Sequence, residues 1–173
     1  MLANLQREIS RSSSSDVRFA TPADVDGLMD LGQMAAHENG VGDMNVMKLL
    51  EVVWRGVTHN RAIAGVIQGL DGRYEAGTLL LVEEQAHSRD PVLVEQTVYV
   101  HPDFRNARGA RATKLVEFNK QVALRLGFPL LIGILSDERT KAKIRLYERH
   151  FGPPNGAYWL WNGNTGHHEE AAE

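Results

Sequence analysis

Apolar residues recur at helical spacing in two neighbouring segments near the start of the chain. The first segment, Pro22–His37, carries them three and four positions apart: Val25, Leu28, Met29, Leu31 and Met34. Thr21 before a proline is typical of a helix start, and Asn39 before a glycine is typical of a helix end. The second segment, Asn45–Val57, repeats the rhythm. We therefore expect two consecutive helices, preceded by a short strand over Val17–Phe19.

Three runs rich in apolar and β-branched residues follow, and they predict strands. They cover Ala62–Gln68, Gly77–Glu84 and Val92–His101. The dipeptide Asp71–Gly72 between the first two runs is typical of a hairpin turn, so these two strands should pair antiparallel. Pro102 follows the third run and blocks its continuation as a central strand.

The second half of the chain alternates between helical and strand patterns. Arg108–Leu126 predicts a helix whose apolar stripe consists of Leu115, Phe118, Val122 and Leu126. Pro129–Leu135 predicts a buried strand, Thr140–His150 a short, positively charged helix, and Ala157–Trp161 a final aromatic strand. The full order is β-α-α-β-β-β-α-β-α-β, which indicates an α/β fold with a mixed sheet.

The length and composition fit one folded unit. A chain of 173 residues, 43% of them hydrophobic, suits one compact domain. The serine-rich run Ser10–Ser15 and the polar last residues bury too little apolar surface to offset the entropy of ordering them. We expect a flexible N-terminal arm over residues 1–15, a single domain over residues 16–161 and a flexible C-terminal tail over residues 162–173.

Charge and cysteine content argue against several classes of function. The chain has 19 basic and 22 acidic residues and a net charge of -3, so only a local basic patch would favour nucleic acid as a partner. Without cysteine it has no disulfide, no thiolate metal site and no cysteine nucleophile. Its histidines lack metal-ligand spacing, and no apolar run reaches the roughly 18 residues that span a bilayer. We expect a cytoplasmic protein that binds no metal, membrane or nucleic acid.

One segment carries a resemblance to a known family. Val98–Arg105 reads as a strand that ends at a proline and leads through a glycine-containing turn, Asn106–Arg111, into a helix. This motif and the element order resemble the GCN5-related N-acetyltransferases (GNAT), in which an Arg/Gln-x-x-Gly-x-Gly/Ala loop binds the pyrophosphate of acetyl-CoA. The resemblance implies a central mixed sheet of about six or seven strands flanked by about four helices. Helix N-termini bind phosphates through unpaired N–H groups and the helix dipole, so the chemistry of the assignment is sound.

The resemblance assigns the cofactor-binding role to a set of residues in these segments: Val98, Tyr99, Val100, Arg105, Asn106, Arg108, Gly109, Ala110, Arg111, Ala112 and Thr140. Asn106 stands where the family has Arg or Gln, although a second register places Arg105 there. Arg111 stands where the family has Gly or Ala. Its side chain either crowds the pyrophosphate or adds a charge-assisted contact to it, and we favour the contact.

A second match lies in the segment Thr140–Arg149. It resembles the family's Asn-x-x-Ala-x-x-Leu-Tyr-Glu helix and shares the core Leu146–Glu148, with Thr140 in place of the asparagine. In the family this tyrosine often lies near the CoA sulfur and acts as general acid. The resemblance therefore implies that role for Tyr147. The alternative is that Tyr147 only packs the helix on the sheet.

Acetyl transfer to an amine also needs a proton acceptor. Glu95 is our candidate because a carboxylate in a central strand should have its pKa raised by desolvation. The alternative is that Glu95 points off the sheet edge or pairs with an arginine. Glu83 and Glu84 at the end of the preceding strand are reserve candidates. The resemblance assigns the oxyanion donor to the backbone of the strand Val98–Val100.

The implied activity is direct transfer of an acetyl group from acetyl-CoA to a primary amine of a small molecule, peptide or protein in a ternary complex. The alternative is a catalytically silent acyl-CoA-binding or protein-interaction module, suggested by the divergent residues Asn106, Arg111 and Thr140. Glu38 and Asp43 lie where the family shapes its acceptor pocket and could attract a cationic amine. The edge of the final strand favours a homodimer.

Overall fold

The computed structural model describes residues 17–39, 43–105, 110–134 and 140–156. Several expectations lie outside these residues. They are the N-terminal arm, the C-terminal tail, the final strand Ala157–Trp161 and the loop residues Asn106, Arg108 and Gly109.

The described elements follow the predicted order. The helices are α2 (Val25–Asn39), α3 (Val46–Val57), α4 (Ala110–Leu126) and α5 (Thr140–Phe151), with short 3-10 turns η1 (Pro22–Asp24) and η2 (Pro102–Phe104). The strands are β1 (Arg18–Phe19), β2 (Ala62–Gln68), β3 (Tyr74–Glu84), β4 (Pro91–Val100) and β5 (Leu130–Ile132). None of the helices in the described ranges is long and apolar enough to cross a membrane.

The strands form one mixed sheet in the order β1-β2-β3-β4-β5. Neighbours are antiparallel except β4 and β5, which are parallel. The predicted hairpin is confirmed, and Gly72 in its turn has a φ of +81° that suits glycine. The expected six or seven strands are corrected to five within the described residues, because the final expected strand lies outside them.

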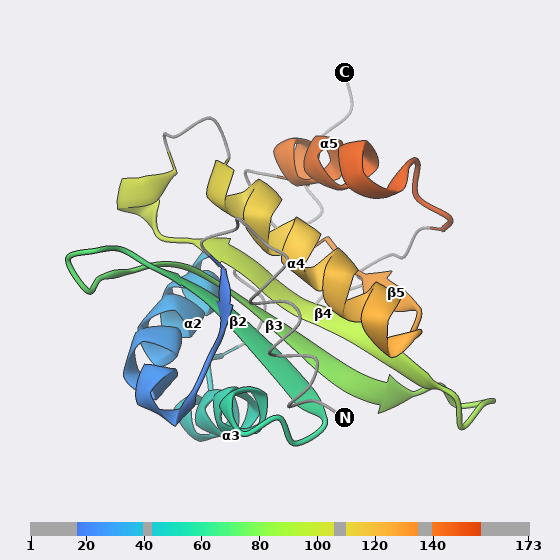
Figure 1. The fold of residues 1–173 in the computed structure, drawn as a ribbon, viewed down its shortest axis with the longest axis horizontal. Coiled ribbons are helices and arrows are strands. Elements are labelled where there is room, and N and C mark those ends of the chain that lie inside the picture. Colours follow the sequence, from blue (N-terminus) through green and yellow to red (C-terminus); the bar gives the residue numbers. More distant parts are fainter. Residues whose placement is uncertain (1–16, 40–42, 106–109, 135–139, 157–173) are drawn as a thin grey trace, which may run out of the picture.

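Helices cover both faces of the sheet (Figure 1). On one face α4 packs its predicted stripe, with Leu115, Phe118 and Val122 buried against Ile63 of β2 and Leu80 of β3. On the other face α2 and α3 pack on the alternate residues of the same strands, such as Ala64 and Leu79. Since β2 and β3 are buried on both sides, they form the centre of the domain. Helix α5 lies beside α4 and contributes Leu146 to the interior.

Element boundaries differ from the predicted ones for local reasons. The first predicted helix begins as η1, where the Asp24 carboxylate accepts hydrogen bonds from the N–H and hydroxyl of Thr21. Strand β3 begins at Tyr74, earlier than expected, and the Tyr74 hydroxyl also donates to Asp24, at 2.8 Å. Within the described residues, strand β5 is shorter than predicted, because its pairing with β4 covers Leu93–Glu95.

Candidate active site

A β-bulge in β4 divides the strand into two parts. Leu79 of β3 pairs with Thr97, and Leu80 pairs with Glu95, so Gln96 is the extra residue. The bulge exchanges the two faces of β4, because one inserted residue reverses the alternation of side chains. Glu95 before the bulge therefore lies on the α4 face, whereas Tyr99 after it packs against α2.

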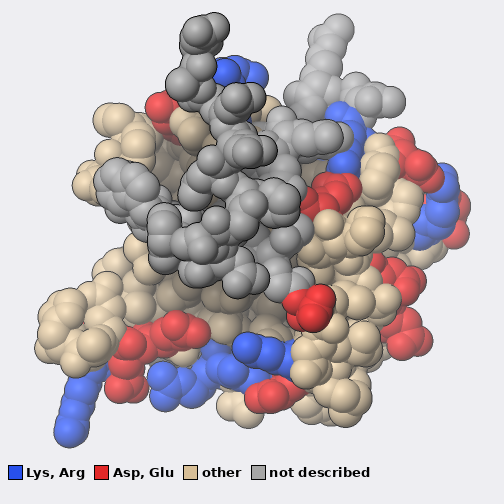
Figure 2. Space-filling view, turned by 180° about the vertical axis from the view of Figure 1, so that it is seen from behind, with Lys and Arg blue, Asp and Glu red and all other residues tan. Residues whose placement is uncertain are grey.

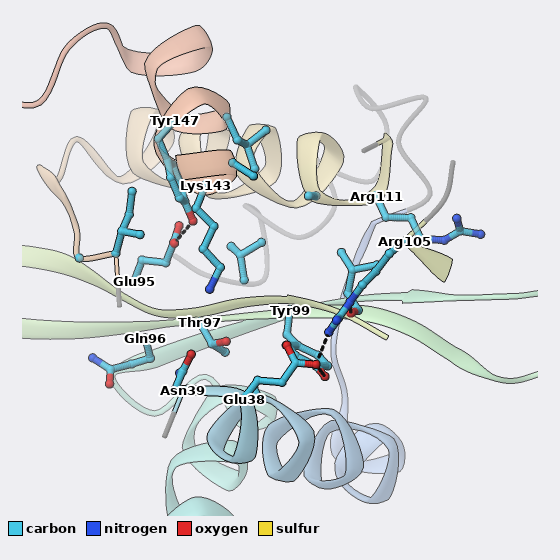
Figure 3. A pocket seen from close by; sticks show the side chains of 18 of the residues that line it. Glu38, Asn39, Glu95, Gln96, Thr97, Tyr99, Arg105, Arg111, Lys143 and Tyr147 are labelled. Atoms are coloured by element: carbon cyan, nitrogen blue, oxygen red, sulfur yellow. Dashed lines mark hydrogen bonds and ion pairs between the residues drawn. The ribbon is translucent and has the colours of Figure 1, made fainter. Parts of the chain in front are cut away.

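Beyond the bulge β4 also separates from β5. The parallel pairing ends at Glu95 and Ile132, while β4 continues to Val100. Over Gln96–Val100 the β5 side of β4 has no strand partner among the described strands. Between these strands and helices α2, α4 and α5 lies a cavity of about 420 Å³ (Figure 3).

The cavity collects most of the residues named from the sequence. Lining residues include both catalytic candidates, Glu95 and Tyr147, and six described cofactor candidates: Val98, Tyr99, Val100, Arg105, Arg111 and Ala112. Ala110 and Thr140, the first residues of α4 and α5, do not line it. Glu83 and Glu84 are exposed near the end of β3 that pairs with Pro91, so the reserve candidates lie outside the cavity.

Glu95 is a buried carboxylate with two described hydrogen-bond partners. Its side chain points towards α4 and α5, where it accepts from the Tyr147 hydroxyl and from the Asn119 amide at 2.8 Å. Burial raises the pKa of Glu95, while the hydrogen bonds from Tyr147 and Asn119 and the charge of Lys143 oppose that rise. The predicted direction of the pKa is thus confirmed. None of the described ion pairs joins Glu95 to an arginine.

Tyr147 reaches the cavity because α5 buries the residue before it. Leu146 is the buried residue of α5, and the next position along the helix turns Tyr147 towards Glu95 (Figure 3). Desolvation and the Glu95 carboxylate raise the pKa of Tyr147 far above its usual range. Tyr147 is therefore a neutral phenol that donates a hydrogen bond to Oε1 of Glu95. Lys143, one turn earlier, points its ammonium group into the cavity in the same view.

The opposite side of the cavity carries an ion pair between α2 and Arg105, the residue that follows η2. Oε1 of Glu38 accepts from Nη2 of Arg105 at 2.7 Å and from the hydroxyl of Tyr99 at 2.8 Å. Nε of Arg105 donates to the carbonyl of Val100 at 2.7 Å. Burial, followed by the bond to Glu38, raises the pKa of Tyr99 to about 12. The charge expected of Glu38 towards a cationic amine is therefore balanced by Arg105.

Arg111 lies in the first turn of α4 and is held by two groups. Its Nε donates to Glu75 of β3 at 2.5 Å, and its Nη1 donates to the carbonyl of Phe104 at 3.1 Å. The guanidinium also lies 5.0 Å from the centroid of the Phe104 ring. These contacts anchor the start of α4 to the end of the β2–β3 hairpin. Whether Arg111 contacts phosphate stays a prediction.

Charge and metal-binding geometry add little to this site. On the face seen in Figure 2, basic and acidic side chains lie side by side. Within the described ranges no group of three or more His, Asp or Glu side chains is arranged to hold a metal ion.

Sequence reasoning missed some residues of the site. Asn119 donates a hydrogen bond to Glu95 and another to Thr78. The two residues lie in a helix and a strand whose apolar pattern does not indicate a polar role. The bulge at Gln96 had no sequence signal either, because the run Val92–Val94 before Glu95 is apolar without alternation.

No family model and no curated protein sequence matches the chain. Solved structures do match. A predicted acetyltransferase from Clostridium acetobutylicum, solved with acetyl-CoA, has a TM-score of 0.66 and 13% identity, covering 88% of this chain and 98% of its own. A ribosomal-protein-alanine N-acetyltransferase from Brucella melitensis has a TM-score of 0.62 and 15% identity, covering 86% and 99%.

An aminoglycoside 6'-N-acetyltransferase from Acinetobacter haemolyticus is also similar, with a TM-score of 0.60 and 14% identity over 84% of this chain and 95% of its own. At these identities the likeness shows the fold. Each of these three neighbours is covered over 95% or more of its own length.

Proposed function

The chain has the fold of the GCN5-related N-acetyltransferases, and from that premise we propose that it transfers an acetyl group from acetyl-CoA to a primary amine. The observation that carries this proposal is the hydrogen-bonded pair of Glu95 and Tyr147 in the cavity where β4 and β5 separate. A buried carboxylate with a raised pKa beside a neutral phenol supplies both a base and an acid at one site.

The cavity suits an elongated acyl-CoA. Its volume of about 420 Å³ lies within the range of small-molecule sites, and it runs along the unpaired side of β4 to the first turn of α4. Small Ala112 lines it next to Arg111, so the N-terminal turn is open to a ligand there. A helix start offers N–H donors to phosphate oxygens. We assign the phosphates to this end and the thioester to the end near Tyr147.

Glu95 is proposed to accept the proton that the amine must lose. An unperturbed ammonium has a pKa of about 10.4 and is mostly unreactive at neutral pH. Desolvation moves the pKa of the Glu95 carboxylate upwards, closer to the operating pH, which is where a general base is most effective. The proton passes from the amine to the carboxylate directly or through water.

Tyr147 is proposed to protonate the departing thiolate. Its raised pKa keeps the hydroxyl protonated at neutral pH, so the proton is present when it is needed. Glu95 takes one proton from the ammonium, and Tyr147 gives its own proton to sulfur and takes that proton from Glu95. The second proton, which the nitrogen loses as the amide forms, passes to solvent. As the C–N bond forms and the C–S bond breaks, both residues return to their starting states.

Backbone N–H groups of the strand Val98–Val100 are proposed to stabilise the negative charge that develops on the carbonyl oxygen. These residues line the cavity beyond the bulge, where β4 is no longer paired with β5. A preorganised N–H donor at such a position costs no reorganisation during the reaction.

The acceptor is proposed to be a primary amine of a small molecule, peptide or protein. Neighbours of this fold include proteins named for aminoglycosides and for a ribosomal protein alanine, both of which present amines. In this chain the acidic Glu38 near the cavity is already paired with Arg105, so a strongly cationic acceptor gains little from it.

Acetyl-CoA binding is the first test. A hundredfold excess of ligand over its Kd should stabilise the folded chain by about 2.7 kcal/mol, measured as a rise in Tm. ATP serves as a control that carries phosphates without the pantetheine arm. No shift with acetyl-CoA or with longer acyl-CoAs would contradict the proposal.

Release of free CoA with a panel of amines is the second test. Amine-dependent release at a rate above that of acetyl-CoA hydrolysis supports an active transferase. Binding without amine-dependent release across small-molecule, peptide and protein amines would instead support the silent acyl-CoA-binding module.

A further inference from the structure

Two polar residues behind Glu95 form a hydrogen-bond chain that the proposed reaction does not use. Asn119 of α4 is fully buried, and Thr78 of β3 is 1% exposed. The Asn119 amide nitrogen lies 2.8 Å from Oε2 of Glu95 and 2.9 Å from the hydroxyl of Thr78. The Thr78 hydroxyl in turn lies 2.9 Å from the carbonyl of Thr97, next to the bulge.

The direction of this chain is fixed by what each group can do. The Thr97 carbonyl can only accept, so the Thr78 hydroxyl donates its single hydrogen to it. The carbonyl oxygen of the Asn119 amide is a more distant acceptor, at 3.1 Å. The Thr78 hydroxyl then accepts from one N–H of Asn119, and the other N–H points at Glu95. Asn119 therefore presents a donor to the carboxylate.

A donor at Oε2 has two consequences for Glu95. It favours the ionised carboxylate, because an N–H can donate to an anion but gains less from a neutral acid. It also favours Oε1 as the oxygen that carries the proton after transfer, since the Asn119 N–H at Oε2 can only donate, whereas the Tyr147 hydroxyl at Oε1 can also accept. Oε1 is the oxygen that faces Tyr147.

The other groups that act on Glu95 do not supply the donor that Asn119 presents to Oε2. Tyr147 and Lys143 of α5 are the titratable groups that act on Glu95 among the described residues, and both lie on the cavity side. Asn119 acts from the opposite, solvent-free side. A buried amide is costly unless its hydrogen bonds are made, so an apolar residue would fill this position at lower cost if packing were its only task.

We propose that Asn119, oriented by Thr78, is a positioning residue that holds Glu95 as an anion and turns Oε1 towards Tyr147. The inference rests on the proposed function, because it assigns Glu95 and Tyr147 to one proton path. The path needs no further reactant: the proton from the amine reaches Oε1, the Tyr147 hydroxyl gives its own proton to the thiolate, and Tyr147 is reprotonated from Oε1.

The test is the titration of the Glu95 carboxyl in the full chain. The chain is labelled with glutamate carrying ¹³C at the side-chain carboxyl, and the Glu95 signal is identified by its loss in Glu95→Gln. Asn119→Leu removes the donor at nearly equal volume, and the Glu95 midpoint should rise by about one pH unit or more. Thr78→Val leaves the amide without its orienting hydroxyl, so the midpoint should rise in the same direction by less.

Thr78→Ser is the matched control, because it keeps the hydroxyl and should keep the wild-type midpoint. If Asn119→Leu does not fold, Thr78→Val against Thr78→Ser still decides the question. A merely structural role would lower the Tm of the variants and leave the midpoint in place, which would overturn the proposal.

Activity separates this inference from the proposed function. With an amine that supports CoA release, the acidic limb of kcat/KM against pH should move to higher pH in Asn119→Leu by the same amount as the carboxyl midpoint. If the Glu95 midpoint moves but the acidic limb of kcat/KM stays in place, the role of Asn119 in acetyl transfer is overturned. A midpoint that moves in a chain that neither binds acetyl-CoA nor releases CoA would instead contradict the proposed function and leave the control of Glu95 by Asn119 supported.

Discussion

At the scale of single residues, the site contains a buried carboxylate, that of Glu95, in a position where an apolar side chain would favour folding more. Glu95 is 8% exposed and meets a phenol and an amide. Its pKa is raised by burial, which means that ionisation of this group is less favourable in the folded chain than in the unfolded one. At neutral pH the proposed base therefore lowers the free energy of unfolding.

Glu95→Gln should therefore stabilise the fold and abolish transfer. A carboxyl whose pKa is raised on folding contributes stability at a pH below its pKa in the unfolded chain, about 4.3. That contribution is lost as the pH rises through its pKa in the folded chain. The neutral amide avoids this loss, so the Tm of the variant should exceed that of the wild type at pH 8, by about 2–4 °C for each kcal/mol. The difference should shrink at pH 5. Thermal unfolding at both pH values checks it, and a lower Tm at pH 8 would contradict it.

Tyr147→Phe should slow turnover while acetyl-CoA still binds. The variant loses the proton donor and keeps the ring, and general acid catalysis contributes about a hundredfold or more. Because a thiolate is a good leaving group, we expect a loss of about tenfold to a hundredfold in kcat. CoA release and the Kd for acetyl-CoA measure the two effects separately. Turnover equal to that of the wild type would remove Tyr147 as the acid and leave it a packing residue.

At the scale of elements, the start of the first helical segment depends on one carboxylate. Asp24 in η1 accepts from Arg18 of β1 at 2.7 Å with both oxygens and from the Tyr74 hydroxyl of β3. The Arg18 guanidinium holds the pKa of Asp24 well below its usual range. Asp24 therefore ties η1 to two strands.

Asp24→Asn should destabilise the fold by about 2 kcal/mol at pH 7, less than a fully buried pair because Arg18 is partly exposed. A carboxyl whose pKa is lowered on folding contributes stability at a pH above its pKa in the unfolded chain, about 3.9. That contribution is lost as the pH falls through its pKa in the folded chain. The gap to the wild type should narrow from about pH 5 towards pH 2 in denaturant unfolding. Asp26→Asn, at an exposed position in the first turn of α2, is the matched control and should change little.

The first turn of α4 allows a test of the two roles left open for Arg111. If its charge contacts the pyrophosphate, Arg111→Met should weaken acetyl-CoA binding by about tenfold, and the difference should diminish in high salt. Glu75→Gln keeps an acceptor for Arg111 and should change the Kd little. Tighter binding in Arg111→Met, measured by calorimetry, would instead show that the side chain crowds the ligand, and an unchanged Kd would show that its charge does not contact the pyrophosphate.

At the scale of the whole molecule, the cavity joins elements that pack separately. Helix α2 lies on one face of the sheet, and α4 lies on the other with α5 beside it, yet residues of all three line the cavity (Figure 1). Leu146 is the single buried residue of α5. Few buried apolar contacts imply a small free energy of local opening, so α5 is the least anchored of the described helices.

Hydrogen exchange should reveal this difference and its response to ligand. The amides of α5 should exchange faster than those of α4, which buries six residues. At a hundredfold excess of acetyl-CoA over its Kd, exchange that requires loss of the ligand should slow by about a hundredfold. Exchange in α3, which does not line the cavity, should be affected less and serves as the internal reference. Equal slowing of exchange in α3 and α5 would contradict a ligand site at α5.

The sequence by itself determined the elements and their order. The apolar rhythm located the helices α2, α3 and α4, and the turn at Gly72 located the β2–β3 hairpin. These features are local, because a helix or hairpin is specified by residues within one or two turns of each other. Glu95 was named because it is an acidic residue in an apolar strand, and Tyr147 was named by the family motif. The structure brings the two into contact.

The tertiary structure alone decided how these elements make a site. The bulge at Gln96 sets the faces of Glu95 and Tyr99, and it depends on pairing with β3 rather than on the sequence of β4. The contact of Asn119 with Glu95 joins positions far apart in the chain, which no local pattern records. Side-chain partners across elements follow from packing, and packing is fixed only when the whole sheet and its helices assemble.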